Sequence, residues 1–210
     1  MAQQPAGELY CGQEVMSTML SPIELLPAPG EWQESDYCPL SERGRLVELS
    51  DGNLEVLDLP AYFHQLILLR LSFLLHAFVE ARKLGHVCFA PLPVRLWPGK
   101  IREPDLMFMS AANTGRIGEY WGVPDLAVEI LSPSTELKDR TIKRAEYAMA
   151  GVVEYWIVDP VAHSIEVLSG ASSAGLWQSS TRVSSPAMLT SPLFPELSIA
   201  LGELFGAGPQ

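Results

Sequence analysis

The spacing of hydrophobic positions divides the chain into a few helices and a larger number of short strands. Between residues 62 and about 83, apolar positions recur at three- and four-residue intervals and Gly85 follows a basic end, which predicts a long helix. Residues 46–59 alternate around the turn Asp51-Gly52-Asn53, which predicts a β-hairpin. Strand-like segments follow at residues 86–97, 103–110 and 124–132.

The second half of the chain predicts one more long helix and then mainly strands. Ser134 or Thr135 can cap a helix that Gly151 closes. Further segments predict strands at residues 153–160, 163–170, 176–185 and 187–201, with a short terminal helix at 201–205. This order favours a mixed α/β sheet with helices packed against it, rather than a helix bundle or a β-sandwich.

Length and composition are those of one globular domain with an appendage. The 210 residues, 48% of them hydrophobic, suffice for a single sizeable core. Residues 1–30 are rich in Pro, Gly and Gln without a sustained period, which predicts a mobile N-terminal extension. Residues 31–210 are predicted to form the single domain, beginning with a short surface helix near residues 31–40.

Neither a membrane span nor secretion is predicted. The longest apolar segment, residues 66–79, is interrupted by Arg70 and His76 and is shorter than a membrane-spanning helix requires. The first residues lack the basic cluster and compact apolar stretch of a secretory signal. The three cysteines are odd in number and widely spaced, as expected of reduced thiols rather than of disulfides or a zinc site. A cytoplasmic location follows.

The acidic balance of the chain limits how it can bind nucleic acid. A net charge of −11 repels a phosphate backbone at long range, so tight binding through the surface as a whole is not expected. A local basic patch remains conceivable, and its candidates are Lys138, Arg140, Lys143 and Arg144.

Two acids interrupt the strand predicted at residues 124–132. Side chains alternate between the faces of a strand, so Asp125 and Glu129 share one face while Leu126, Val128 and Ile130 form an apolar core face. A carboxylate on the first face must reach solvent, pair with a cation or bind a metal, because burying it alone is very costly. Asp125, just after Pro124, is more typical of a turn residue than of a ligand.

Asp105 begins the preceding apolar strand in the same manner. If the two strands are neighbours, Asp105 and Glu129 converge into an oxygen-rich site that suits a hard divalent cation such as Mg²⁺. The alternative is that each acid is simply solvated or forms a turn at a strand end. Tyr155 and Trp156, which alternate in the strand at 153–160, are interpreted as packing residues.

Several segments together resemble one family. "FVEARKLGHVCFAPLPVRL", "REPDLMFMS" and "GVPDLAVEILSPSTELKDRTIKRAEYAMAGVVEYWIVDP" are similar to the Uma-two family of restriction endonucleases, a branch of the PD-(D/E)XK nuclease superfamily. The resemblance covers roughly residues 45–167. It implies a restriction-endonuclease-like core of helix, three strands, helix and strand, which agrees with the order of elements predicted between residues 62 and 159.

The resemblance also implies roles for particular residues. Asp105 takes the place of the Asp of the motif and Glu129 that of its second acid, so both are expected to bind metal, as Mg²⁺ or Mn²⁺. Leu131 stands where the motif has lysine. Lys143, on the following helix, is the expected substitute, with Lys138 as its rival and a plain surface ion pair between Asp139 and Lys143 as the alternative.

Two upstream residues complete the expected site. Glu48 and His64 fall where this family tends to carry a polar residue near the site. The alternatives are an exposed hairpin acid for Glu48 and a solvated ring at the helix start for His64.

The sequence therefore predicts a metal-dependent endodeoxyribonuclease acting on DNA, and the superfamily implies a homodimer. Two alternatives remain open: a nuclease-like fold without activity that serves as a binding or regulatory module, and a phosphodiesterase acting on small nucleotides. Phosphate-binding loop, dinucleotide-binding and serine-hydrolase motifs do not occur in the sequence.

Overall fold

A six-stranded mixed sheet forms the centre of the computed structural model, which describes residues 26–118 and 120–206. Its strand order is β10-β9-β8-β7-β6-β3, and only the neighbours β7 and β8 run parallel. The strands of this sheet are β3 (Gly85–Phe89), β6 (Leu106–Ser110), β7 (Leu126–Ile130), β8 (Glu154–Asp159), β9 (Ser164–Ala171) and β10 (Trp177–Ser184). The predicted mixed α/β sheet is thus confirmed.

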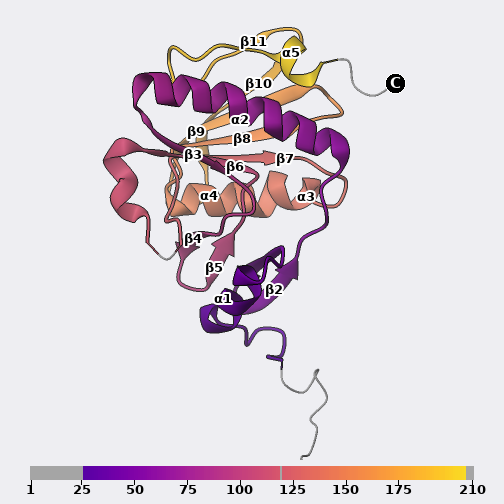
Figure 1. The fold of residues 1–210 in the computed structure, drawn as a ribbon, viewed down its shortest axis with the longest axis vertical. Coiled ribbons are helices and arrows are strands. Elements are labelled where there is room, and N and C mark those ends of the chain that lie inside the picture. The colour runs from indigo at the N-terminus through magenta and orange to yellow at the C-terminus, as the bar shows by residue number, and fades with distance from the viewer. Residues whose placement is uncertain (1–25, 119, 207–210) are drawn as a thin grey trace, which may run out of the picture.

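The sheet lies between two helical layers (Figure 1). Helix α2 (Tyr62–Arg82) covers one face, where its inward residues join apolar side chains of the inner strands in the largest core cluster. The second layer is one continuous helical segment made of α3 (Glu136–Lys138), the π-helical turn η3 (Asp139–Lys143) and α4 (Arg144–Ala150). Both faces of β7 are consequently buried: Leu126, Val128 and Ile130 face α2, and Ala127 faces the α4 side.

A smaller antiparallel sheet, in the order β2-β1-β5-β4, lies below α4 (Figure 1). The predicted hairpin is confirmed as β1 (Val47–Ser50) and β2 (Asn53–Val56). Strand β5 (Lys100–Arg102) was not predicted, because residues 98–100 read as a turn. It pairs with both β1 and β4 (Val94–Trp97), and so joins the hairpin to the rest of the fold.

The remaining elements are short. Helix α1 (Glu34–Glu42) packs Tyr37 against Val47, Leu49 and Ile101 of the smaller sheet. The 3₁₀ helix η2 (Ala111–Arg116) follows β6, and β11 (Met188–Leu189) pairs with β12 (Ile199–Ala200) ahead of α5 (Leu201–Phe205). Most of the predicted N-terminal extension, residues 1–25, lies outside the described residues.

By length and composition alone, α2 is the one helix in the described residues able to cross a membrane, with a mean hydropathy of 1.4. Only 28% of that stretch is buried within the fold. Its inner residues Ile67, Leu71, Leu75 and Val79 are fully buried against the sheet, whereas Leu69 and Phe73 on the outer side are 57% and 72% exposed. The helix therefore serves as the core helix of this domain while presenting an apolar outer surface.

Candidate active site

The antiparallel pairing of β6 and β7 brings the two predicted metal-binding acids together. Leu106 pairs with Val128, and continuing this register by one residue places Asp105 across from Glu129. Side chains at opposite positions of an antiparallel pair lie on the same face about 5 Å apart at Cβ. Both acids line one cavity of about 430 Å³ between the start of α2 and the start of α3.

The Asp105 carboxylate contacts one residue of β7 and one residue of α2. Its Oδ2 accepts a hydrogen bond from the backbone N–H of Ile130 at 2.7 Å and lies 3.2 Å from Nε2 of His64. Burial lowers the pKa of His64, but the adjacent Asp105 carboxylate outweighs it and raises that pKa above its ordinary value. His64 is largely buried, so the interpretation as a solvated ring at the helix start is wrong.

Glu129 is buried and receives two hydrogen bonds on one oxygen. Its Oε1 accepts from Lys143 Nζ at 2.8 Å and from the Tyr147 hydroxyl at 2.6 Å. Burial, reinforced by the negative charges of Asp139 and Asp105, raises the pKa of Glu129 well above its ordinary value despite Lys143. Burial and the neighbouring acids thus disfavour the charged form of Glu129, and Lys143 offsets this only in part.

Lys143 lies at the centre of three carboxylates. Its Nζ is 2.8 Å from Glu129, 3.0 Å from Glu48 and 3.6 Å from Asp139. Burial lowers the pKa of Lys143, but these acids outweigh it and raise that pKa well above its ordinary value, so the amine stays protonated. Asp139 is 1% exposed and Lys143 4%, so the alternative of a plain surface ion pair is wrong.

The π-helical turn η3 runs from Asp139 to Lys143. Such turns are rare and occur frequently at functional sites, where the extra residue rotates the side chains that follow. Leu131 packs in the apolar cluster on the α4 side and is not among the residues that line the cavity. An ammonium group nevertheless lies beside Glu129, because Lys143 of the helical segment supplies it in place of Leu131, which follows β7.

Glu48 is fully buried, so its interpretation as an exposed hairpin acid is wrong. Its Oε2 accepts hydrogen bonds from Arg102 at 2.9 Å and from Lys138 at 2.8 Å. Its Oε1 accepts a hydrogen bond from the backbone N–H of Glu103 at 3.0 Å. Burial raises the pKa of Glu48, but Lys143, Arg102 and Lys138 outweigh it and hold that pKa below its ordinary value. Lys138 therefore contacts the site through Glu48, whose other carboxylate oxygen contacts Lys143.

The structure adds three residues that the sequence interpretation did not assign to the site: Glu103, Asp139 and Tyr147. Glu103 lines the cavity and accepts a hydrogen bond from Tyr37 of α1 at 3.2 Å, and burial raises its pKa to about 7. Asp139, Lys143 and Tyr147 follow one another at four-residue spacing on a helix, which is the sequence signal that places them on one side.

Asp125 lies at the opposite end of β7 from this cluster. It is 3% exposed, and its carboxylate accepts hydrogen bonds from the backbone of Ser110 and from Asn113, both at 2.7 Å. It therefore fixes the connection between η2 and β7, in agreement with its interpretation as a turn residue.

The four candidate residues for a local basic patch do not form one. Lys138 and Lys143 turn inward to Glu48 and Glu129, as described above. Arg140 pairs with Glu136 and Asp159, and Arg144 pairs with Glu166. Each cation of this group is matched by at least one carboxylate, so the helix surface carries no surplus positive charge.

Comparisons with known proteins place the chain in a family. The model of the Uma2 family, described as "Putative restriction endonuclease", matches residues 32–202, so the chain belongs to this family. No curated protein matches the chain. A solved structure from Anabaena variabilis, titled "a putative nuclease belonging to DUF820", is similar with a TM-score of 0.69 at 19% sequence identity. The similarity covers 83% of this chain and 97% of that one, and at this identity it establishes the fold.

The donor atoms at the site fit the hard divalent cation that the nuclease fold implies. Asp105 Oδ1 and Glu129 Oε2 have no hydrogen-bond partner among the described residues. Glu103 Oε2 and Asp139 Oδ1 are buried and likewise accept no hydrogen bond there. No three His, Cys, Asp or Glu side chains in residues 26–118 and 120–206 are grouped closely enough to hold a metal alone. Two carboxylates completed by water and phosphate are the usual ligands of Mg²⁺, so a closed protein cage is not required.

Proposed function

We propose that this chain is a divalent-metal-dependent endodeoxyribonuclease that hydrolyses phosphodiester bonds. The observation that carries the proposal is the position of Asp105 and Glu129 on adjacent strands of one cavity, with the Lys143 ammonium 2.8 Å from Glu129. Membership of a family described as restriction endonucleases and a fold shared with a DUF820 protein titled as a nuclease support it.

Asp105 and Glu129 are the residues that would hold the cation, through Oδ1 and Oε2, which accept no hydrogen bond from the part of the chain that the structure describes. Mg²⁺ or Mn²⁺ bound there would polarise the scissile phosphate and lower the pKa of a coordinated water. Lys143, kept protonated by its three acids, offers a positive charge to the phosphate as negative charge develops on it. His64 positions Asp105, and Glu48 positions Lys143.

A phosphodiesterase acting on small nucleotides is the second candidate. The acid-lined cavity and the net charge of −11 favour it, because neither attracts a long polyanion. A nuclease-like binding module without activity is the remaining alternative, which Leu131 and the acidic charge of the chain favour. The Lys143 ammonium beside Glu129 supports the nuclease over this module, because it supplies the positive charge that Leu131 lacks.

We further propose a cytoplasmic homodimer. Cutting both strands of a duplex calls for two active sites, and the apolar outer surface of α2 around Leu69 and Phe73 offers a contact between two copies. The thiols of Cys38 and Cys88 are free, as in reducing compartments.

Cleavage of plasmid DNA tests the nuclease proposal. The wild-type chain is expected to nick or linearise the plasmid with Mg²⁺ or Mn²⁺ and to leave it intact with EDTA. Asp105→Asn and Glu129→Gln, which preserve shape, should each abolish cutting, whereas Glu196→Gln, an exposed acid paired with Arg82, should not. Cutting by the two site variants at the wild-type rate would refute the proposal. Parallel assays with small phosphodiesters separate the two candidate substrates.

A further inference from the structure

Most cationic side chains of this protein already have a partner within the fold. All 14 Lys and Arg residues of the chain fall within the described residues. Most of their side chains pair with carboxylates, as Arg102 does with Glu48, Glu55 and Glu146, and Arg70 donates to a backbone carbonyl. Across residues 26–118 and 120–206, only Arg43, Arg45 and Lys83 have side chains with neither an ion pair nor a hydrogen bond.

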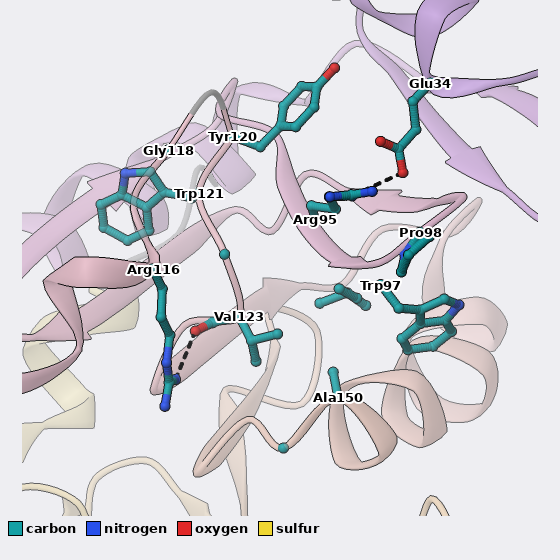
Figure 2. Close-up of a pocket in the computed structure, with 13 residues that line it drawn as sticks. Glu34, Arg95, Trp97, Pro98, Arg116, Gly118, Tyr120, Trp121, Val123 and Ala150 are labelled. Carbon is teal, nitrogen blue, oxygen red and sulfur yellow. Dashed lines mark hydrogen bonds and ion pairs between the residues drawn. The ribbon is translucent and has the colours of Figure 1, made fainter.

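A second hollow in the described residues is also lined by cations that have partners (Figure 2). This hollow of about 750 Å³ is lined by two arginines and two tryptophans near the start of β7. Arg95 Nε lies 2.9 Å from Glu34, and Arg116 donates to the carbonyl of Val123 at 3.1 Å. Both guanidinium groups already have partners within the fold, so this hollow is not a binding site with free cations for a polyanion.

The two arginines whose side chains have neither an ion pair nor a hydrogen bond among the described residues occupy one turn beside the proposed active site. Arg43 and Arg45 flank Gly44 in the connection between α1 and β1, and both are exposed. Gly44 has φ +69, a left-handed conformation that favours glycine and sets the direction of this turn. The next residue, Leu46, lines the active-site cavity, and Glu48 follows two residues later in β1. An extended chain rises about 3.3 Å per residue, so Arg45 begins roughly 10 Å from Glu48 along the strand.

Lys83 lies far from this position. It is the C-terminal cap of α2, whereas His64, which contacts Asp105, belongs to the first turn of the same helix. At 1.5 Å per residue, about 28 Å of helix separate the two. Of the three cations without a side-chain partner in the described residues, Arg43 and Arg45 are thus the two that lie near the cavity-lining residue Leu46.

A nucleic acid strand needs such an anchor at this site. Glu103, Asp105 and Glu129 line the cavity, so its acidic wall offers no attraction to the phosphates of a long strand. Phosphates next to the scissile one lie outside the cavity and are held in proteins mainly by arginine and lysine. Exposed guanidinium groups without carboxylate partners provide this contact without breaking an existing ion pair.

We infer that Arg43 and Arg45 bind backbone phosphates of the DNA strand and hold it across the mouth of the active-site cavity. The inference rests on the proposed nuclease function and adds to it the position of the strand. The contact reads no bases, since it is made to phosphate groups alone.

The salt dependence of DNA binding tests this inference. Fluorescence anisotropy with a labelled duplex of about 20 base pairs in EDTA measures binding by the full chain without cleavage, between 50 and 200 mM KCl. Each phosphate contact contributes about 0.9 to the slope of log affinity against log salt. Arg43→Gln and Arg45→Gln should each lower the slope by about 0.9. Raising the salt from 50 to 200 mM lowers the affinity of every variant, and the factor of this loss should be about ten times smaller for the double variant than for the wild type.

Lys83→Gln is the matched control, because it removes an equally uncompensated charge far from the cavity. Its slope should equal that of the wild type, and thermal melting should show that all variants are folded. If the arginine variants behave like Lys83→Gln, or the wild-type chain does not bind the duplex at 50 mM KCl, the inference is overturned. Magnesium-dependent plasmid cutting is scored separately: its absence with the arginine-dependent slope intact would overturn the proposed function and leave the phosphate contact standing.

Discussion

Glu48 Oε1 and Lys143 Nζ lie 3.0 Å apart, and neither side chain is more than 5% exposed. This ion pair joins β1 of the smaller sheet to the helix that covers the central sheet. The lysine reaches Glu129 with the same amine, so one buried charge connects the hairpin, the helix and the strand that carries the proposed metal ligand. The smaller sheet thus contributes a buried residue, Glu48, to the candidate site.

Replacing Lys143 by methionine should destabilise the fold. Removing one partner of a buried ion pair leaves its carboxylates uncompensated and typically costs about 3 kcal/mol. The loss should be greater at pH 8 than at pH 5, because the pKa of Glu129 is already raised and protonation at low pH removes its charge. Urea unfolding of Lys143→Met at both pH values measures this, with the exposed Lys83→Met as control. A cost equal to that of the control would show that the buried cluster does not contribute to stability.

Acid should weaken the fold through Glu48. The folded-state pKa of Glu48 lies below its unfolded value, so its stabilising effect is complete above pH 4.5 and is lost as pH falls below that value. Glu48→Gln should therefore cost roughly 3 kcal/mol of unfolding free energy at neutral pH, and the difference from the wild type should shrink as pH falls below 4.5. Urea titrations from pH 7 to pH 3 follow the trend, and Glu55→Gln, a less buried partner of Arg102, should show a smaller effect. A difference independent of pH would contradict this assignment.

The outer surface of α2 should control self-association. Phe73→Glu places a charge at the centre of the exposed apolar stripe without touching the core, since Phe73 is 72% exposed. Sedimentation velocity at micromolar concentration should show a dimer for the wild type and a monomer for Phe73→Glu. Val161→Glu, at a position 94% exposed elsewhere on the surface, should remain a dimer. A Phe73→Glu dimer would remove α2 as the interface.

Elements with local periodicity were predictable from the sequence. The hairpin and α2 follow from alternation and from helical spacing, and their bounds agree with the structure within a few residues. Strand β5 was missed because its three residues follow the tight turn at Gly99 and two of them, Lys100 and Arg102, are charged. Their burial depends on Glu146, which lies on α4, far along the chain. No local pattern shows such a partnership.

The site was only partly predictable for the same reason. Register and strand ends indicated Asp105 and Glu129, since each acid interrupts an otherwise apolar strand. The choice between Lys138 and Lys143 was not resolvable, because the π-helical turn changes the direction of Lys143 relative to an ordinary helix. The structure shows both lysines bound to Glu48, through different oxygens, with Lys143 alone of the two also reaching Glu129.

Calorimetric titration with Mn²⁺ tests most directly whether Asp105 and Glu129 form one cation site. The wild-type chain should bind one Mn²⁺ per chain at this site. Asp105→Asn and Glu129→Gln should each weaken that binding by more than about tenfold, the loss that follows even when a partner supporting a ligand is removed. Glu196→Gln should bind as the wild type does. Absence of binding by the wild type, or equal affinity in all four proteins, would contradict the account.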